Sequence, residues 1–364
     1  MAISSTARAL LASVLLATLA GCTPPMATTP APPARPPGAQ TVTPSGEATS
    51  ICPVRRSLPP SANPPGRILA RGDKQKLIAG VDPSDATMSH WNSATQKFEG
   101  FNIDLLVEVA RALWPEGNPR DRIEFRVVPP GQGSFEMLNR GEIDLIATSL
   151  TASCERAKEV LFSNDYLDSG QTVLVRKRDG GPEFAGVEQL GGKRVCAANN
   201  TTSLAAIRRY QTAGGQRLVP VATEHSIDCL VMLRQGQVDG VSTDENILHG
   251  FAQMAPDTML VTEPPRPDRQ FCTYNLSDDC RWFTDEPHAF AFRLNDREVA
   301  AFVNHVLALP STRQAWLTAH ARWLAGHPDA GRDPDTGART PMIPSPGEPV
   351  TSWPPPHPSA APTG

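Results

Sequence analysis

The stretch Met-Leu-Asn-Arg-Gly-Glu-Ile-Asp at residues 137–144 recurs in outline as Met-Leu-Arg-Gln-Gly-Gln-Val-Asp at residues 232–239. Each copy reads as a helix end, a glycine suited to the left-handed C-cap position, and the start of an apolar strand. The first strand runs on to a Thr-Ser pair and the second to a Thr-Asp pair. Such turns are common and short matches arise by chance, but the shared order, spacing and polar strand ends favour two related lobes.

Around the first copy, strand and helix patterns alternate, which predicts an α/β fold with a mainly parallel sheet. The expected elements are a strand at 77–81, a helix ending at 113, a strand at 123–128, a short helix at 135–140 and a strand at 143–148. Ligands of such sheets bind at the carboxyl ends of strands. Asp82 and Ser149 stand at two of these ends.

The segment from Ser149 to Arg156 is the first candidate for a binding site. It is predicted to end a strand and to open a polar, capped helix. Hydroxyls, free backbone N–H groups, the helix dipole and a guanidinium together suit the capture of a carboxylate. The alternative is that Ser153 is an ordinary N-cap and Arg156 a surface residue.

The second lobe offers a matching pair of candidates. The polar run 199–203 follows a predicted strand at 195–198 and precedes a helix at 204–209, so its residues are either ordinary caps or a second anion contact. Asp244 ends a strand of small and apolar residues and suits an ammonium group. Two α/β lobes with a cleft between them would trap a small polar molecule.

The N-terminus predicts export. Arg8 precedes an apolar run, 9–19, that is too short to span a bilayer, so we interpret residues 1–21 as a signal peptide. The sequence Leu-Ala-Gly-Cys ending at Cys22 resembles a lipobox, and we expect Cys22 to be lipidated and to anchor the protein extracytoplasmically to the cell membrane. An ordinary signal peptide is the alternative.

Proline content sets the expected domain limits. Residues 23–66 hold 13 prolines and residues 327–364 hold 11, and such compositions are typical of extended or disordered segments. We therefore predict a Pro-rich tether at 22–66 and a disordered Pro-rich tail at 327–364. The part between them, about 260 residues, is long enough for two lobes.

Cysteines in an exported chain are expected to form disulfides. The six candidates, which allow fifteen connectivities, are Cys52, Cys154, Cys196, Cys229, Cys272 and Cys280. The favoured hypothesis pairs 272 with 280, 196 with 229, and 52 with 154. No Cys-x-x-Cys spacing occurs, so we expect no metal and no cofactor. The formal net charge of −4 gives no support for nucleic-acid binding.

Several ordered motifs resemble extracellular solute-binding protein family 3, the polar amino-acid-binding components of ATP-binding-cassette (ABC) importers. They are GFNID at 100–104, GEIDL at 141–145, Thr151 with Glu155 and Arg156, Phe162-Ser163 with Tyr166, LGGKRV at 190–195, and GQVD at 236–239. The cysteines at 154, 196 and 229 are similar to those of the actinobacterial glutamate/glutamine-binding branch.

This resemblance implies a type II periplasmic-binding-protein fold, with two α/β lobes joined by a two-strand hinge. Lobe 1 would comprise residues 67–175 plus 289–326, and lobe 2 residues 176–288. The linking strands would be 171–176 outward and 289–294 back.

The resemblance also assigns ligand contacts. Arg156 would bind the α-carboxylate, with Thr151, Ser149 and Thr202 donating beside it, and Asp244 would bind the α-ammonium. Asp82 would contact the side chain, with Trp91 or Phe101 as an apolar wall. Trp91 stands where the glutamate-binding branch is expected to have an arginine, and Ala198 where lysine is common, so a second ligand carboxylate would lack a charge partner.

The predicted function is capture of a polar amino acid of the glutamate, glutamine, aspartate and asparagine class by hinge closure, for delivery by a monomer to an ABC permease. One alternative is a sensor subunit that docks on a signalling membrane protein. The other is a cyclohexadienyl dehydratase-like enzyme, whose general acid would have to be Asp82 or His90. No nucleophile–base pair is evident, so we expect no enzymatic activity.

Overall fold

The computed structural model describes residues 40–41, 54–70, 75–261, 282–324, 330–332, 339–341 and 349–354, all within one compact unit, 33–364. The predicted signal peptide, Cys22, Cys52, Cys272 and Cys280 lie outside the described residues. Within the described part, no helix has the length and hydropathy needed to cross a membrane.

Lobe 1 is built on a five-stranded sheet with the order β5-β2-β6-β14-β7. β2 (Leu77–Val81) runs parallel to both β5 (Ile123–Val127) and β6 (Leu145–Ile146). β14 (Ala291–Arg293) returns from the far part of the chain and pairs antiparallel with β6 and with β7 (Val160–Phe162). The parallel arrangement of the first three strands is as predicted.

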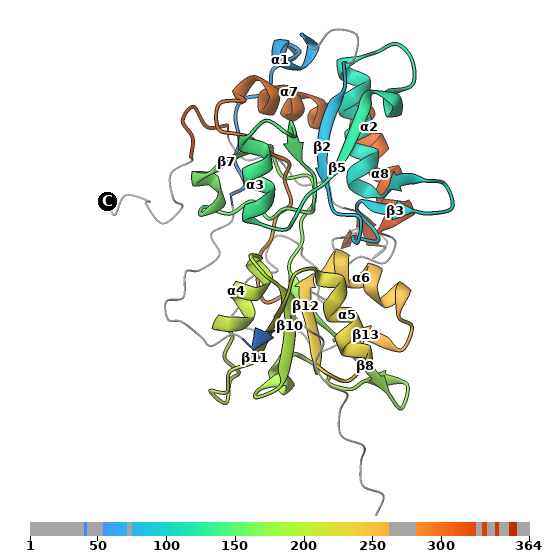
Figure 1. The fold of residues 1–364 in the computed structure, drawn as a ribbon, viewed down its shortest axis with the longest axis vertical. Coiled ribbons are helices and arrows are strands. Elements are labelled where there is room, and N and C mark those ends of the chain that lie inside the picture. Colours follow the sequence, from blue (N-terminus) through green and yellow to red (C-terminus); the bar gives the residue numbers. More distant parts are fainter. Residues whose placement is uncertain are drawn as a thin grey trace, which may run out of the picture. The chain divides into compact units, whose positions relative to one another are not determined.

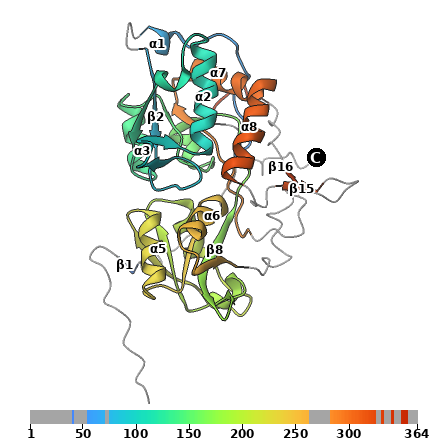
Figure 2. The same ribbon diagram turned by 90° about the vertical axis from the view of Figure 1, so that its right-hand side faces the viewer.

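Helices cover both faces of this sheet (Figure 1). α2 (Phe101–Leu113), α7 (Arg297–Ala308) and α8 (Pro310–Trp323) share one apolar core with β2, and α2 and α8 pack together (Figure 2). α3 (Gln132–Asn139) covers the other face. Apolar residues three and four positions apart in α2 form the buried side of that helix, which is why its limits match the sequence pattern. The smaller elements are α1 (Gly66–Leu69), β3 (His90–Asn92), β4 (Lys97–Glu99), η2 (Pro119–Arg122) and η3 (Arg156–Lys158).

Lobe 2 has a mixed sheet with the order β1-β11-β10-β12-β8-β13, and β9 pairs with β8. The strands are β1 (Gln40–Thr41), β8 (Gln171–Arg178), β9 (Gly181–Pro182), β10 (Arg194–Ala198), β11 (Val219–Thr223), β12 (Gly240–Asp244) and β13 (Thr258–Leu260). β10 runs parallel to β11 and β12, whereas β8 is antiparallel to β12. β15 (Ala330–Arg332) and β16 (Arg339–Pro341) form a separate antiparallel pair.

The helices of lobe 2 also lie on two faces. α4 (Thr202–Arg209) packs on one face, with the short η4 (Val187–Leu190), and α5 (Ser226–Arg234) and α6 (Glu245–Met254) pack on the other. The disulfide Cys196–Cys229 ties β10 to α5 and confirms that predicted pair. Cys154 is disulfide-bonded as well, and because Cys196 and Cys229 bond each other, its partner lies outside the described residues.

The repeated sequence forms two equivalent turns, one in each lobe. The glycine of each copy has a positive φ, 73° in the first and 71° in the second, which favours glycine. Asp144 accepts the Ile78 N–H at 2.8 Å, and Asp239 accepts the Arg194 N–H at 2.9 Å. In both lobes the last residue of the repeat therefore holds the backbone of the neighbouring strand, so the two copies of the repeat have the same local structure.

Two antiparallel segments connect the lobes, and backbone hydrogen bonds link Phe283 to Gln171, Glu286 to Ser169 and His288 to Leu167. These linking segments, residues 167–171 outward and 283–288 back, come earlier in the chain than the predicted linking strands 171–176 and 289–294. Those residues instead belong largely to β8 and β14, because each strand is needed to fill a gap in its own lobe's sheet.

Parts of both proline-rich segments pack on lobe 1. Residues 54–65 lie within the predicted tether, yet the Val54 N–H donates to the Ala152 carbonyl at 2.9 Å and Val54 is buried. From the predicted tail, the Trp353 indole N–H donates to the carbonyls of Ala157 and Val160 at 2.9 and 3.0 Å. A few apolar and hydrogen-bonding residues thus fix short stretches of sequence that composition alone marks as extended.

Candidate functional site

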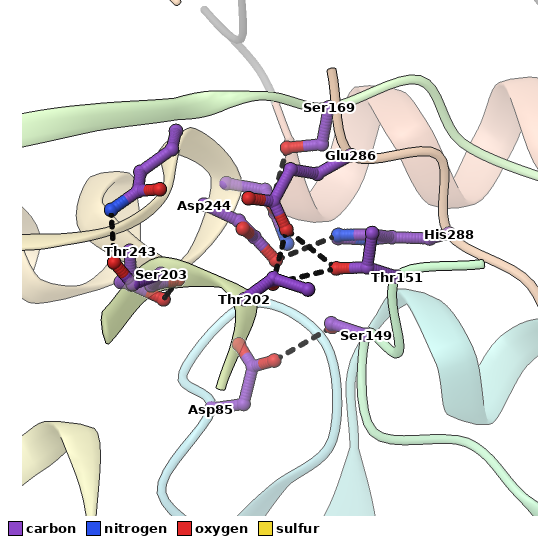
Figure 3. A network of polar contacts seen from close by, with 12 residues as sticks. Asp85, Ser149, Thr151, Ser169, Thr202, Ser203, Thr243, Asp244, Glu286 and His288 are labelled. Atoms are coloured by element: carbon purple, nitrogen blue, oxygen red, sulfur yellow. Dashed lines mark hydrogen bonds and ion pairs between the residues drawn. The ribbon is translucent and has the colours of Figure 1, made fainter. Parts of the chain in front are cut away.

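The crossings carry a buried carboxyl group that bridges the two lobes. Glu286 accepts a hydrogen bond from the Thr151 hydroxyl at 2.6 Å and one from the Thr202 hydroxyl at 2.5 Å through the same oxygen (Figure 3). Thr151 follows β6 in lobe 1, whereas Thr202 is the first residue of α4 in lobe 2. The other carboxylate oxygen of Glu286, Oε1, accepts a hydrogen bond from the Thr284 hydroxyl at 2.9 Å.

Burial raises the pKa of Glu286 to about 7, and the charge of Asp244 adds to this effect. The threonine hydrogen bonds oppose it because they stabilise the charged form.

Asp244 and His288 form the second part of the site. Asp244 ends β12, and its Oδ2 lies 2.9 Å from the His288 Nε2. His288 is fully buried, and a backbone bridge connects it to Thr151. The Asp244 Oδ1 is buried and has no hydrogen-bond partner within the part of the chain that the structure describes. Such an acceptor is costly unless a ligand donates to it, so this oxygen suits an ammonium group.

Arg156 lies at the lobe 1 side of the group. Its guanidinium donates to the Thr151 carbonyl at 2.9 Å. Burial lowers the pKa of Arg156, and the charges of Glu286 and Asp244 act in the opposite direction. Arg156 is therefore a partly desolvated cation within electrostatic range of two carboxyl groups. A guanidinium in this environment can bind a carboxylate through charge-assisted hydrogen bonds.

The helix predicted after Ser153 is wrong in length. The structure has one 3-10 turn, η3 (Arg156–Lys158), because the chain must enter β7 at Val160. Ser153 does accept the Arg156 N–H, at 3.4 Å. With so short a turn, the positive charge for an anion comes from the guanidinium rather than from a helix dipole.

Ser149 faces a carboxylate that the sequence did not single out. Ser149 has a φ of 54° and donates its hydroxyl to Asp85 Oδ2 at 2.8 Å. Asp85 is buried, which raises its pKa to about 8, and the charges of Asp82 and Asp244 add to the shift while the Ser149 hydrogen bond opposes it. Asp85 lies in the loop after β2, which also contains Asp82. A loop has no periodic pattern, so the sequence does not indicate which of the two aspartates points inward.

Asp82 lies within electrostatic range of Asp85, whereas Trp91 and Phe101 lie elsewhere. The Asp82 carboxylate accepts the Ser84 N–H and hydroxyl at 2.9 and 2.7 Å. Trp91 is 47% exposed and packs edge-on against Phe98 in the β3–β4 hairpin. Phe101 is fully buried in the lobe 1 core against Tyr166 and Trp316. The structure thus brings Thr151, Arg156, Thr202 and Asp244 into one group, with Ser149 beside Asp85, and leaves Trp91 and Phe101 outside it.

Glu286 and His288 were also missed by sequence reasoning. The sequence held one signal for these two residues, because the polar run 284–288 directly precedes an apolar strand. In the structure this run lies opposite the outgoing crossing. His90, the proposed general acid, packs its ring edge-on against Trp323. Within the described ranges no group of three His, Cys, Asp or Glu residues is arranged to hold a metal ion.

The lobes also touch beside the site. The Thr87 hydroxyl of lobe 1 donates to the Asn246 carbonyl of α6 at 3.1 Å. A Cβ atom added at Gly250 of α6 would lie 2.9 Å from the Ala86 Cβ. Glycine at position 250 therefore permits close approach of α6 to the loop that carries Asp85.

Comparison with known proteins agrees with this architecture. Residues 77–326 match the family described as bacterial extracellular solute-binding proteins, family 3. The chain is 27% identical, over 70% of its length and 84% of the relative's, to the glutamine-binding protein of an ABC transporter from Bacillus subtilis. It is 27% identical, over 57% of its length and 65% of the relative's, to the glutamate-binding protein of Corynebacterium glutamicum.

The fold has solved counterparts. The cysteine-binding protein of Campylobacter jejuni superimposes with a TM-score of 0.56 at 18% identity, over 70% of this chain and 92% of that one. This likeness confirms the predicted type II periplasmic-binding-protein fold. Because the family match covers most of the chain, the chain belongs to the bacterial extracellular solute-binding proteins, family 3.

Proposed function

We propose that this protein binds a polar α-amino acid between its lobes and delivers it to an ABC importer. One observation carries the proposal: hydroxyls from both lobes, Thr151 and Thr202, already hold a carboxylate, that of Glu286. A free amino acid presents the same chemical group, and Arg156 adds the cation that a ligand carboxylate requires. The buried Asp244 Oδ1, which none of the described residues hydrogen-bonds, would accept the α-ammonium.

In this proposal the mechanism is hinge closure. Lobe 1 offers Arg156 and Thr151, and lobe 2 completes the site with Thr202 and Asp244 when the crossings bend. The ligand carboxylate takes over the two hydroxyls, and Glu286 moves off them or is neutralised by a proton. Closure excludes water, so each charged contact becomes stronger.

The location and partner form part of the same proposal. The predicted lipid anchor at Cys22 would hold the protein at the outer face of the membrane, where a monomer would meet the permease. Delivery to a permease is favoured over a signalling role because the Bacillus subtilis relative carries the name of an ABC transporter component.

Binding calorimetry across the twenty amino acids, followed by ligand analogues, tests recognition of the amino-acid backbone. We expect at least one polar amino acid to bind, and we expect its decarboxylated and N-acetylated analogues each to lose at least about tenfold in affinity, because each forfeits a charge-assisted contact. Equal binding of both analogues, or no binding by any amino acid, would contradict the proposal.

Gly250→Leu tests closure without touching a ligand contact. Leucine at this position improves helix propensity within lobe 2, but its side chain would collide with Ala86 of lobe 1. We expect weaker amino-acid binding by calorimetry, with a ligand-free melting temperature equal to or above that of the wild type. Unchanged affinity would contradict closure of α6 onto the Asp85 loop. Gly66→Leu is the control for glycine replacement in a helix, because Gly66 is an exposed residue of α1 where an added Cβ meets nothing within 4 Å.

A further inference from the structure

The side-chain end of the site is strongly acidic. Asp85 lies in a loop of lobe 1 and Asp244 at the end of β12 in lobe 2, and each is nine-tenths or more buried. The charges that act most strongly on Asp85 are those of Asp82 and Asp244, and both are negative. Arg156 is in electrostatic range of Glu286 and Asp244, at the carboxylate end of the site. The side-chain end of the site is therefore acidic, whereas the carboxylate end carries the Arg156 cation.

Two buried oxygens at this acidic end have no hydrogen-bond partner among the described residues, and they are Asp85 Oδ1 and Asp244 Oδ1. The other oxygen of Asp85, Oδ2, accepts the Ser149 hydroxyl. Figure 3 shows the Asp85 carboxylate turned toward Thr202 and Asp244. Each unpartnered acceptor carries a desolvation cost that a donor from a ligand would remove.

In the proposed function the ligand's α-ammonium goes to Asp244. The buried Asp85 Oδ1 then remains as an acceptor for a donor on the ligand's side chain, and the charges of Asp82 and Asp244 act on it. A ligand carboxylate placed there would add a further negative charge in a dry site, at a large cost. An amide would donate to Asp85, yet it brings no charge and carries a carbonyl oxygen that nearby carboxylates repel. With its pKa raised to about 8, the Asp85 carboxyl of the ligand-free protein is largely protonated near pH 7. A guanidinium or ammonium beside it donates to its oxygens and also stabilises its charged form, which an amide or a carboxylate does not do.

Resting on the proposed function, we propose that the ligand's side chain is cationic and that Asp85 is the residue that selects it. The ligand class is an α-amino acid with a guanidinium or ammonium side chain. Binding would place the α-carboxylate at Arg156, the α-ammonium at Asp244 and the side-chain cation at Asp85, so that each charged group of the ligand meets an opposite charge. Such a ligand lies outside the glutamate, glutamine, aspartate and asparagine class that the sequence analysis predicts.

Arginine and citrulline make a matched pair of probes, because their side chains have nearly the same shape and differ in charge. Calorimetry on the full wild-type chain is expected to give arginine or another cationic amino acid at least about tenfold higher affinity than citrulline, glutamine or glutamate, since ionic hydrogen bonds are roughly twice as strong as neutral ones. If citrulline, glutamine or glutamate binds as tightly as the cationic amino acids, the proposal is overturned while the proposed function stands.

The variant Asp85→Asn tests whether Asp85 causes the preference for a cationic side chain. The substitution keeps the side-chain shape, and we expect the arginine-to-citrulline affinity ratio to fall toward one while citrulline affinity changes little. The ligand-free variant should melt at or above the wild-type temperature, because a buried carboxylate near two others has been removed. A ratio unchanged from wild type would overturn the role of Asp85. Asp121→Asn, at an exposed position of η2, is the control that should leave the ratio unaltered. Failure of every amino acid to bind would instead remove the proposed function and this inference together.

Discussion

Replacement of Arg156 by methionine is expected to weaken amino-acid binding by at least about thirtyfold, since loss of one partner of a buried, hydrogen-bonded charge pair costs about 2–5 kcal/mol. The ligand carboxylate would then be desolvated between Thr151 and Thr202 with no cation beside it. Methionine retains much of the volume of the side chain, so the packing of η3 should survive. Calorimetry with the best wild-type ligand measures the effect.

Two comparisons make the Arg156 result specific. Arg140→Met removes an exposed arginine of lobe 1 whose partners are Glu136 and Glu142, and it should bind as the wild type does. Arg156→Lys keeps a charge but loses the fork geometry, so its affinity should lie between those of wild type and Arg156→Met. Near-wild-type affinity in Arg156→Met would mean that the carboxylate binds elsewhere.

Replacement of Arg55 by methionine should destabilise the fold by about 3–5 kcal/mol, the range for removing one partner of a buried ionic group. Arg55 lies outside the family match, in the segment 54–65, and ion-pairs with Asp165, Asp168 and Asp285. Asp168 lies in the outgoing crossing and Asp285 in the return crossing, whereas Asp165 precedes the outgoing one. One arginine therefore holds both crossings where they run side by side, and its loss would leave three carboxylates facing one another.

Urea unfolding of the full chain measures this change. Arg56→Met is the matched control, since the neighbouring Arg56 is exposed and its loss should stay within about 0.5 kcal/mol. Adding Asp168→Asn to Arg55→Met should recover part of the lost stability, because it removes one of the mutually repelling charges. A destabilisation in Arg55→Met no larger than that in Arg56→Met would show that the three aspartates do not depend on this arginine.

The local sequence carried enough information to predict most of the helices and strands. α2 and β2 match their expected limits because the spacing of apolar residues reports which face a segment buries, and that is a local property. The repeated turn could be predicted for the same reason. Its glycine with positive φ and its aspartate, which hydrogen-bonds to the neighbouring strand, lie within eight residues of each other.

The side chains of the site likewise include some that local sequence patterns indicate and some that they do not. Thr151, Arg156, Thr202 and Asp244 follow strand ends, and parallel strands bring such positions to one edge of a sheet. Trp91 and Phe101 were expected as a cleft wall, but the side that each turns to depends on what the hairpin and α2 pack against. Asp85, Glu286 and His288 lie in loops and crossings, where no periodic pattern indicates direction.

Local patterns in the sequence were enough to predict two α/β lobes and to propose Arg156 and Asp244 for the two charged groups of an amino acid. They also favoured the Cys196–Cys229 pair among fifteen possible connectivities. Three features came from the folded structure alone: Glu286 accepts hydroxyls of both lobes, Asp85 lies within electrostatic range of Asp244, and Arg55 pairs with aspartates of both crossings. The physical reason is separation along the chain. Burial and charge at these positions arise from groups that are tens to hundreds of residues apart, and only the folded chain places them within a few ångströms of one another.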